Sequence, residues 1–87
     1  MRADREKVGR LLRTARGQID GILRMIESDA YCMDVSNQIM AAQSVLGRAN
    51  REIIRAHLEG CVLDAMENGT GEEKMKEIMS VIDKLSR

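Results

Sequence analysis

Three stretches of the chain repeat apolar residues at helical spacing. Between Val8 and Ile26 they recur at steps of three, four and one, which is typical of an amphipathic helix over roughly residues 4–27. From Val35 to Ala56 they alternate steps of four and three, as in a heptad, and predict a helix from residue 31 or 32 to residue 67. The third stripe is shorter and consists of Met75, Ile78, Met79, Ile82 and Leu85. The pattern predicts an all-α protomer of three helices.

The residues between these stripes carry signals for helix ends. Ser28-Asp29 offer turn and N-cap chemistry between the first two helices. Gly60 weakens the second helix near its end by roughly 1 kcal/mol relative to alanine, but Asn68-Gly69 make a better stop. Thr70 and Glu73 have the spacing of a capping box, which predicts that the third helix begins there.

The composition predicts one domain, residues 1–87, that is short of core. The chain has no Trp, no Phe, no Pro and a single tyrosine, so aliphatic and methionine side chains must fill the interior. An 87-residue core of this kind is marginal for an isolated monomer. Because the apolar stripes are too extensive for a lone chain of this size, we expect a homodimer built on antiparallel helices.

The formal net charge is zero, but the charges are unevenly distributed. Residues 1–16 hold six basic and two acidic side chains, whereas residues 59–87 hold seven acidic and four basic ones. A basic end suggests a polyanionic partner, and basic residues at helical spacing are candidates for phosphate contacts. These candidates are Arg10, Arg13, Arg16, Arg48, Arg51 and Arg55. The alternative is a solvated face, since no helix-turn-helix or zinc finger is apparent.

The chain has no recognisable targeting or membrane segment. Its N-terminus is densely charged, and the longest stretch without a charge, residues 35–47, is too short and too polar to span a bilayer. We therefore expect a cytoplasmic protein. In that reducing compartment, two cysteines favour a metal or redox site over a structural disulfide.

The only histidine, His57, precedes Cys61 by four residues, so both side chains lie on one face of the second helix. Cys32 is the obvious third donor, but it lies 25 residues before His57, or about 37 Å along a continuous helix. If two such helices pack antiparallel across a two-fold axis, Cys32 of one protomer faces His57 and Cys61 of its partner. The pattern then predicts two equivalent sites per dimer.

Two thiolates and one imidazole suit Cu(I) in a trigonal arrangement, whereas Zn(II) needs a fourth ligand or a water. Three alternatives remain open. The cysteines could be small buried hydrophobes beside a hydrogen-bonded surface histidine. A thiol oxidoreductase could use both cysteines, with His57 lowering a thiol pKa, but the chain lacks a Cys-x-x-Cys unit and a cofactor fingerprint. A purely structural helical interaction module is the third.

The string "RTARGQIDGILRMIESDAYCMDVSNQIMAAQSVLGRANR", followed by "HLEGC", resembles the copper-sensitive operon repressor (CsoR) family of bacterial metal-sensing repressors. The similarity runs from about Val8 to Leu85. Its most specific part is a cysteine followed by a His-x-x-x-Cys pair, here Cys32, His57 and Cys61, which matches the copper branch. Nickel/cobalt relatives are expected to use additional histidines, and formaldehyde sensors to lack the second cysteine. A persulfide sensor keeps both cysteines and stays an alternative.

The resemblance implies an antiparallel helical dimer that assembles into a flat dimer-of-dimers tetramer. It implies Cu(I) bound between protomers and operator DNA bound by the metal-free form. Around His57 it implies a second layer of contacts, for which Tyr31 and Glu77 occupy the matching positions. Glu77 would orient the imidazole by accepting its second N–H. Arg16 and Arg48 match basic positions of the family well, which favours DNA binding.

Overall fold

The computed structural model describes residues 1–69 and 71–85, and it leaves out the side chains of residues 82 and 85. The chain forms three helices: α1 (Arg5–Glu27), α2 (Cys32–Asn68) and α3 (Gly71–Leu85). The predicted all-α protomer with three helices is confirmed, and the predicted bounds of the first two helices hold to within a residue. Apolar positions Ile82 and Leu85 of the third stripe lie outside the described side chains.

The connection between α1 and α2 differs in one respect from the prediction. Ser28 ends α1 and its N–H binds the carbonyl of Arg24, while Asp29 adopts a left-handed backbone with φ 56°. These two residues form the turn as predicted, but the N-cap of α2 is Tyr31, which makes no side-chain capping bond. The prediction of N-cap chemistry from Ser28-Asp29 is therefore wrong, because Ser28 closes the preceding helix and α2 begins three residues after Asp29.

The start of α1 and the end of α2 are capped, and the predicted stop at Asn68-Gly69 is confirmed. Asp4 caps α1 because its carboxylate accepts hydrogen bonds from the backbone N–H groups of Glu6 and Lys7, at 2.9 and 3.3 Å. Gly69 ends α2 in the left-handed conformation at φ 68°, and its N–H binds the carbonyl of Ala65 at 2.9 Å. Thr70, the first half of the predicted capping box, lies outside the described residues.

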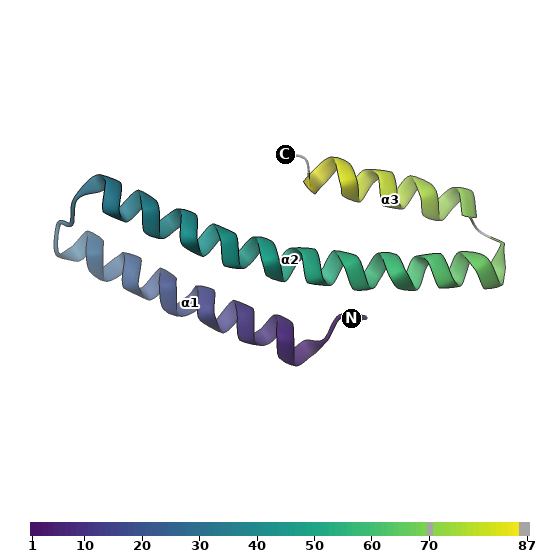
Figure 1. The fold of residues 1–87 in the computed structure, drawn as a ribbon, viewed down its shortest axis with the longest axis horizontal. Coiled ribbons are helices and arrows are strands. Elements are labelled where there is room, and N and C mark those ends of the chain that lie inside the picture. The colour runs from purple at the N-terminus through teal and green to yellow at the C-terminus, as the bar shows by residue number, and fades with distance from the viewer. Residues whose placement is uncertain (70, 86–87) are drawn as a thin grey trace.

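The three helices form a single layer (Figure 1). The antiparallel α1 lies along the first half of α2, whereas α3 folds back along its second half on the opposite edge. The Cα extents are 57 × 27 × 12 Å, and the radius of gyration is 17.5 Å. A globular chain of this length would have a radius of gyration of about 12 Å. Both broad faces of α2 are therefore uncovered by the protomer itself.

The core is correspondingly small. Its buried side chains are mostly alanines and aliphatics, namely Ala3, Val8, Ala15, Ile22, Ala42, Ala49 and Cys61. Many members of the predicted apolar stripes are exposed instead, including Leu23 and Ile26, each more than half exposed. The apolar stripe of an amphipathic helix is wider than the surface that one neighbouring helix can cover. The exposed remainder is the kind of surface that an obligate oligomer buries.

The residues before α1 pack on the second half of α2. Ala3 is buried, and the Arg2 side chain lies over Gly60 and pairs with Asp64 at 2.7 Å. Figure 1 accordingly places the N-terminus beside the middle of α2. Among the described residues, no helix is both long enough and apolar enough to cross a membrane.

Candidate metal centre

His57 and Cys61 come together on α2 as their spacing predicts. The two residues are one turn apart, and the Cys61 sulfur lies 3.5 Å from His57 Nε2. Cys61 is 2% exposed, whereas nearly half of the His57 side chain is accessible to solvent. The thiol is thus held in the packed layer while the imidazole lies at its edge, where a metal ion can reach it.

Glu77 of α3 completes a group of three donors. Because α3 runs back along α2, its carboxylate reaches His57 Nε2 at 2.5 Å through Oε1. The Cys61 thiol donates to the other carboxylate oxygen, Oε2, at 3.7 Å. The ligand atoms of the three residues all lie within 4.8 Å of one another. Glu77 therefore contacts His57 within the same chain. Glu77 is the residue that the family resemblance suggested as the hydrogen-bond acceptor for the imidazole.

These contacts set the charge of the group. The hydrogen bond from His57 lowers the pKa of the Glu77 carboxyl below its ordinary value, and nearby Lys74 and the Cys61 thiol add smaller effects in the same direction. Lys74 Nζ lies 3.8 Å from Glu77 Oε2. Glu77 is therefore an anion that accepts hydrogen bonds, which is the state that either orients a metal-binding imidazole or binds a cation directly.

Cys32 and Tyr31 lie at the opposite end of α2. Cys32 is the first residue of the helix and is exposed, and Tyr31 before it is 68% exposed. Since α2 is continuous over its 37 residues, the two cysteines are about 43 Å apart along the helix. A disulfide within one chain requires Cα atoms closer than about 7 Å and is excluded. Neither Cys32 nor Tyr31 can contact His57 of the same chain.

The two ring nitrogens of His57 are not equivalent. Nε2 faces both Glu77 and Cys61, and a nitrogen that donates its hydrogen to a carboxylate has no free lone pair for a metal. The imidazole can therefore bind a metal through Nδ1 while Nε2–H stays on Glu77. Alternatively, it can bind through Nε2 when the metal replaces that hydrogen bond.

All six predicted phosphate-binding arginines are exposed: Arg10, Arg13, Arg16, Arg48, Arg51 and Arg55. Three of them, Arg48, Arg51 and Arg55, line a hollow of 230 Å³ between α1 and α2 together with Lys7. Lys7 was not among the predicted residues, and its ammonium pairs with Glu52 at 3.3 Å. Arg55 is engaged locally, since its guanidinium binds Glu52 and Glu59, each at 2.7 Å. Its charge is less available to a phosphate than that of Arg48 or Arg51.

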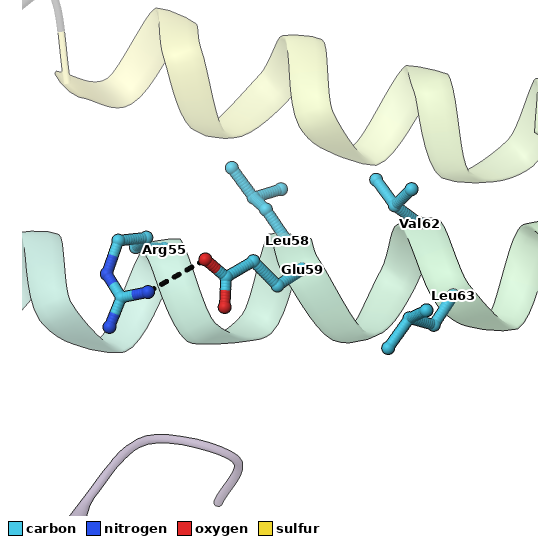
Figure 2. A pocket seen from close by; sticks show the side chains of 5 residues that line it. All are labelled: Arg55, Leu58, Glu59, Val62 and Leu63. Atoms are coloured by element: carbon cyan, nitrogen blue, oxygen red, sulfur yellow. Dashed lines mark hydrogen bonds and ion pairs between the residues drawn. The ribbon is translucent and has the colours of Figure 1, made fainter.

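A second hollow lies on the half of α2 that carries His57 and Cys61. Its volume is 490 Å³, and it is lined by Arg55, Leu58, Glu59, Val62 and Leu63. Figure 2 shows Leu58 and Val62 directed toward α3, with the Arg55–Glu59 ion pair beside them and Leu63 on the opposite side of the helix. Val62 and Leu63 are about half exposed, so this half of α2 presents an apolar surface that the protomer leaves open.

Comparison with known proteins gives a consistent result across sequence and structure. Residues 4–84 match the protein family described as metal-sensitive transcriptional repressor. The copper-sensing transcriptional repressor CsoR of Mycobacterium ulcerans is 49% identical over 71 residues, which make up 82% of this chain and 61% of that protein. The chain thus spans about three fifths of the length of this mycobacterial relative. CsoR of Bacillus subtilis is 31% identical over 97% of this chain and 83% of its own.

Two solved structures share the fold. The nickel-responsive transcriptional regulator InrS superimposes with a TM-score of 0.85 at 25% identity, covering 98% of this chain and 96% of its own. The copper-sensing repressor CsoR with Cu(I) from Geobacillus thermodenitrificans superimposes with a TM-score of 0.82 at 32% identity, covering 94% of this chain and 85% of its own. The same three-helix layer therefore serves proteins named for different metals, and the donor atoms must distinguish between them.

Proposed function

The chain belongs to the metal-sensitive transcriptional repressor family, and on that premise we propose that it is a Cu(I)-responsive repressor. The metal-free protein binds operator DNA and releases it when Cu(I) binds. Cys32 of one protomer, together with His57 and Cys61 of another, holds the copper. DNA as the partner, and thiols that must stay reduced, make the cytoplasm its compartment.

The arrangement of the sulfur atoms along α2 carries this proposal. The turn with His57 and Cys61 supplies one thiol and one imidazole, and the only other thiol in the sequence, that of Cys32, is exposed at the far end of the same unbroken helix. Cu(I) prefers soft thiolate ligands. A second thiolate can reach Cys61 only from another chain, so a copper site with two sulfurs requires an oligomer.

An antiparallel dimer would supply the second thiolate for copper and cover the exposed apolar side chains of α2. When two α2 helices lie antiparallel, the Cys32 end of each approaches the Cys61 end of the other, and the apolar side chains along α2 are covered. Tyr31, the residue before Cys32, then lies near the partner's His57. Two such dimers form the tetramer that the family resemblance implies. The oxidoreductase alternative is disfavoured because its two thiols cannot pair within one chain.

Copper must be coupled to the helices if the protein is to sense it. With Nδ1 on the metal, His57 keeps Nε2–H on Glu77, which links the copper site to α3 of the same chain. The conformation favoured by copper binds DNA less well, as linkage requires of any effector that releases DNA. The operator is held through Arg48 and Arg51, with Arg10, Arg13 and Arg16 along α1 and a smaller part for Arg55.

An anaerobic Cu(I) titration of the protein on operator DNA, followed by fluorescence anisotropy, tests the function. We expect release to be complete at one Cu(I) per chain. Release by a persulfide donor but not by Cu(I) would instead identify a persulfide sensor on the same residues. Binding that neither reagent changes would refute the sensing function.

A mixture of variants tests the shared site. Cys32→Ala and Cys61→Ala chains each lose one thiolate from every site, but a heterodimer of the two retains one intact site of two. Copper binding by the mixture should therefore exceed that of either variant alone. If it never does, the metal is not held between protomers.

A further inference from the structure

We propose that His57, Cys61 and Glu77 of a single protomer form a Zn(II) site that needs no residue from another chain. The site shares two residues with the proposed copper site but replaces the second sulfur with a carboxylate oxygen. It is built from one turn of α2 and the facing turn of α3. Cys32 takes no part in it.

The spacing of the three donor atoms fits tetrahedral zinc. Zinc binds cysteine sulfur at about 2.3 Å, histidine nitrogen at about 2.0–2.1 Å and carboxylate oxygen at about 2.0–2.2 Å. At tetrahedral angles these bonds place sulfur about 3.6 Å from both nitrogen and oxygen. The structure has 3.5 Å from Cys61 Sγ to His57 Nε2 and 3.7 Å from Cys61 Sγ to Glu77 Oε2. Two edges of the tetrahedron therefore exist before any metal arrives.

Along the third side, His57 Nε2 donates to the other carboxylate oxygen, Glu77 Oε1, in a hydrogen bond of 2.5 Å that zinc at Nε2 would replace. The single hydrogen of the neutral imidazole passes from Nε2 to Nδ1 by exchange with solvent, and the Cys61 thiol loses its proton to solvent. Nε2 and the zinc-bound carboxylate oxygen then lie about 3.4 Å apart, as two zinc bonds at a tetrahedral angle require. The adjustment involves only the side chains of His57 and Glu77, which are 47% and 39% exposed.

The surroundings suit a site with an open fourth position. His57 and Glu77 are partly exposed, so a water molecule can complete the coordination, as in zinc sites with three protein ligands. A ligand set of one nitrogen, one sulfur and one oxygen is ordinary for Zn(II), whereas Cu(I) favours soft sulfur ligands. The like charge nearest to a bound cation is that of Lys74, whose ammonium lies 3.8 Å from Glu77 Oε2.

A consequence follows that rests on the proposed function. Copper at the shared site links two chains through Cys32, but zinc held within one protomer leaves Cys32 without a metal bond. Zinc would also occupy Nε2 and remove the hydrogen bond from His57 to Glu77, which copper at Nδ1 retains. The two sites, which share His57 and Cys61, would thereby separate an ion that signals from one that does not.

Binding of Zn(II), and of Co(II) as its visible substitute, to the full chain tests the site without DNA or copper. In Cys32→Ala we expect the Zn(II) affinity to stay within about threefold of wild type and the cobalt–thiolate charge-transfer band to keep its full intensity. Cys61→Ala should abolish that band. A band that falls by half in Cys32→Ala would mean that both thiolates bind the metal, and the proposal would be wrong.

The role of Glu77 is tested by changing the atom it offers. Glu77→Gln should lower the Zn(II) affinity at least tenfold, but a residue that only orients His57 would do the same. Glu77→His separates the two, because X-ray absorption at the zinc edge should then detect two bound imidazoles where the wild type has one. Glu73→His, one turn earlier on α3 and exposed, is the matched control and should leave one imidazole. Helicity by circular dichroism checks that each variant folds.

An unchanged single imidazole in Glu77→His would overturn the proposal, as would two thiolates bound to zinc in the wild type. Neither result bears on copper. Conversely, failure of Cu(I) to release DNA would refute the proposed function and leave the zinc measurements as they stand.

Discussion

Replacing Gly60 with alanine tests whether the N-terminal residues are held on α2 beside the metal centre. A Cβ at position 60 would lie 2.2 Å from Arg2 Nη1 and 2.5 Å from Arg2 Cδ, closer than real contacts allow. The clash involves only a flexible side chain, so Arg2 must swing away and its 2.7 Å pair with Asp64 must break. The helix itself has no reason to move.

The net effect on stability is the difference between two small quantities. Alanine in place of glycine in a helix interior stabilises by about 1 kcal/mol. Loss of the exposed Arg2–Asp64 pair costs about 0.2–1 kcal/mol. We therefore expect Gly60→Ala to gain between about 0 and 0.8 kcal/mol. Gly17→Ala in α1 is the matched control, because nothing lies within 4 Å of its Cβ and it should show the full gain of about 1 kcal/mol.

Urea denaturation at one fixed protein concentration measures both variants, in the wild-type background and in Arg2→Ala. Without the Arg2 side chain, Gly60→Ala should regain the full benefit seen for Gly17→Ala, since there is nothing left to displace. If Gly60→Ala has the same effect in both backgrounds, Arg2 does not lie on Gly60 and the packing described for the N-terminal residues is wrong.

Three further predictions concern coupling, DNA and acid stability. His57→Ala should keep Cu(I) on the two thiolates but lose much of the copper-driven release from DNA, which for a typical coupling is a 5–150-fold change in DNA affinity. Anisotropy measures this change, and release equal to wild type would contradict the coupling through the histidine. Arg48→Ala should weaken DNA binding and make the slope of log K against log salt shallower by about 0.9, and an unchanged slope would place the DNA elsewhere. Hydrogen bonds from Arg55 and Lys7 lower the pKa of Glu52, so its contribution to stability is present above the ordinary carboxyl pKa of about 4.3 and is lost as pH falls through the lowered value. Glu52→Gln should therefore destabilise near neutral pH and converge with wild type in acid; a constant difference across pH would contradict the ion pairs.

The helices and the His57–Cys61 pair could be predicted from the sequence because both depend on local periodicity. A step of four on a helix fixes which side chains are neighbours whatever else the chain does. The same periodicity correctly separated Cys32 from His57, since a helix converts sequence distance directly into length. The stop at Gly69 was also local, because its left-handed φ favours glycine.

Contacts between elements could not be predicted in this way. Periodicity gives no direction for α3 relative to α2, so the pairing of Glu77 with His57 was suggested only by the family resemblance. Nothing local marks Arg2 as a neighbour of Gly60, 58 residues later, or Ala3 as buried. The start of α2 was predicted correctly, but Tyr31 as its N-cap was not, because Ser28 and Asp29 offered better capping chemistry.

The core and the proposed copper site are incomplete for the same reason. Because α1 and α3 cover different halves and edges of α2, the protomer is one helix thick and leaves apolar side chains such as Met40 and Leu63 exposed. The second thiol that a copper site at Cys61 requires is that of Cys32, at the far end of α2. The uncovered faces of α2 likewise require another chain. In the dimer that we propose, a second protomer laid antiparallel on α2 would supply both at once, and the metal would bind where the two chains meet. An ion that joins Cys32 of one chain to Cys61 of the next would then act directly on the relative position of the two α2 helices, and on the arginines Arg48 and Arg51 that they carry.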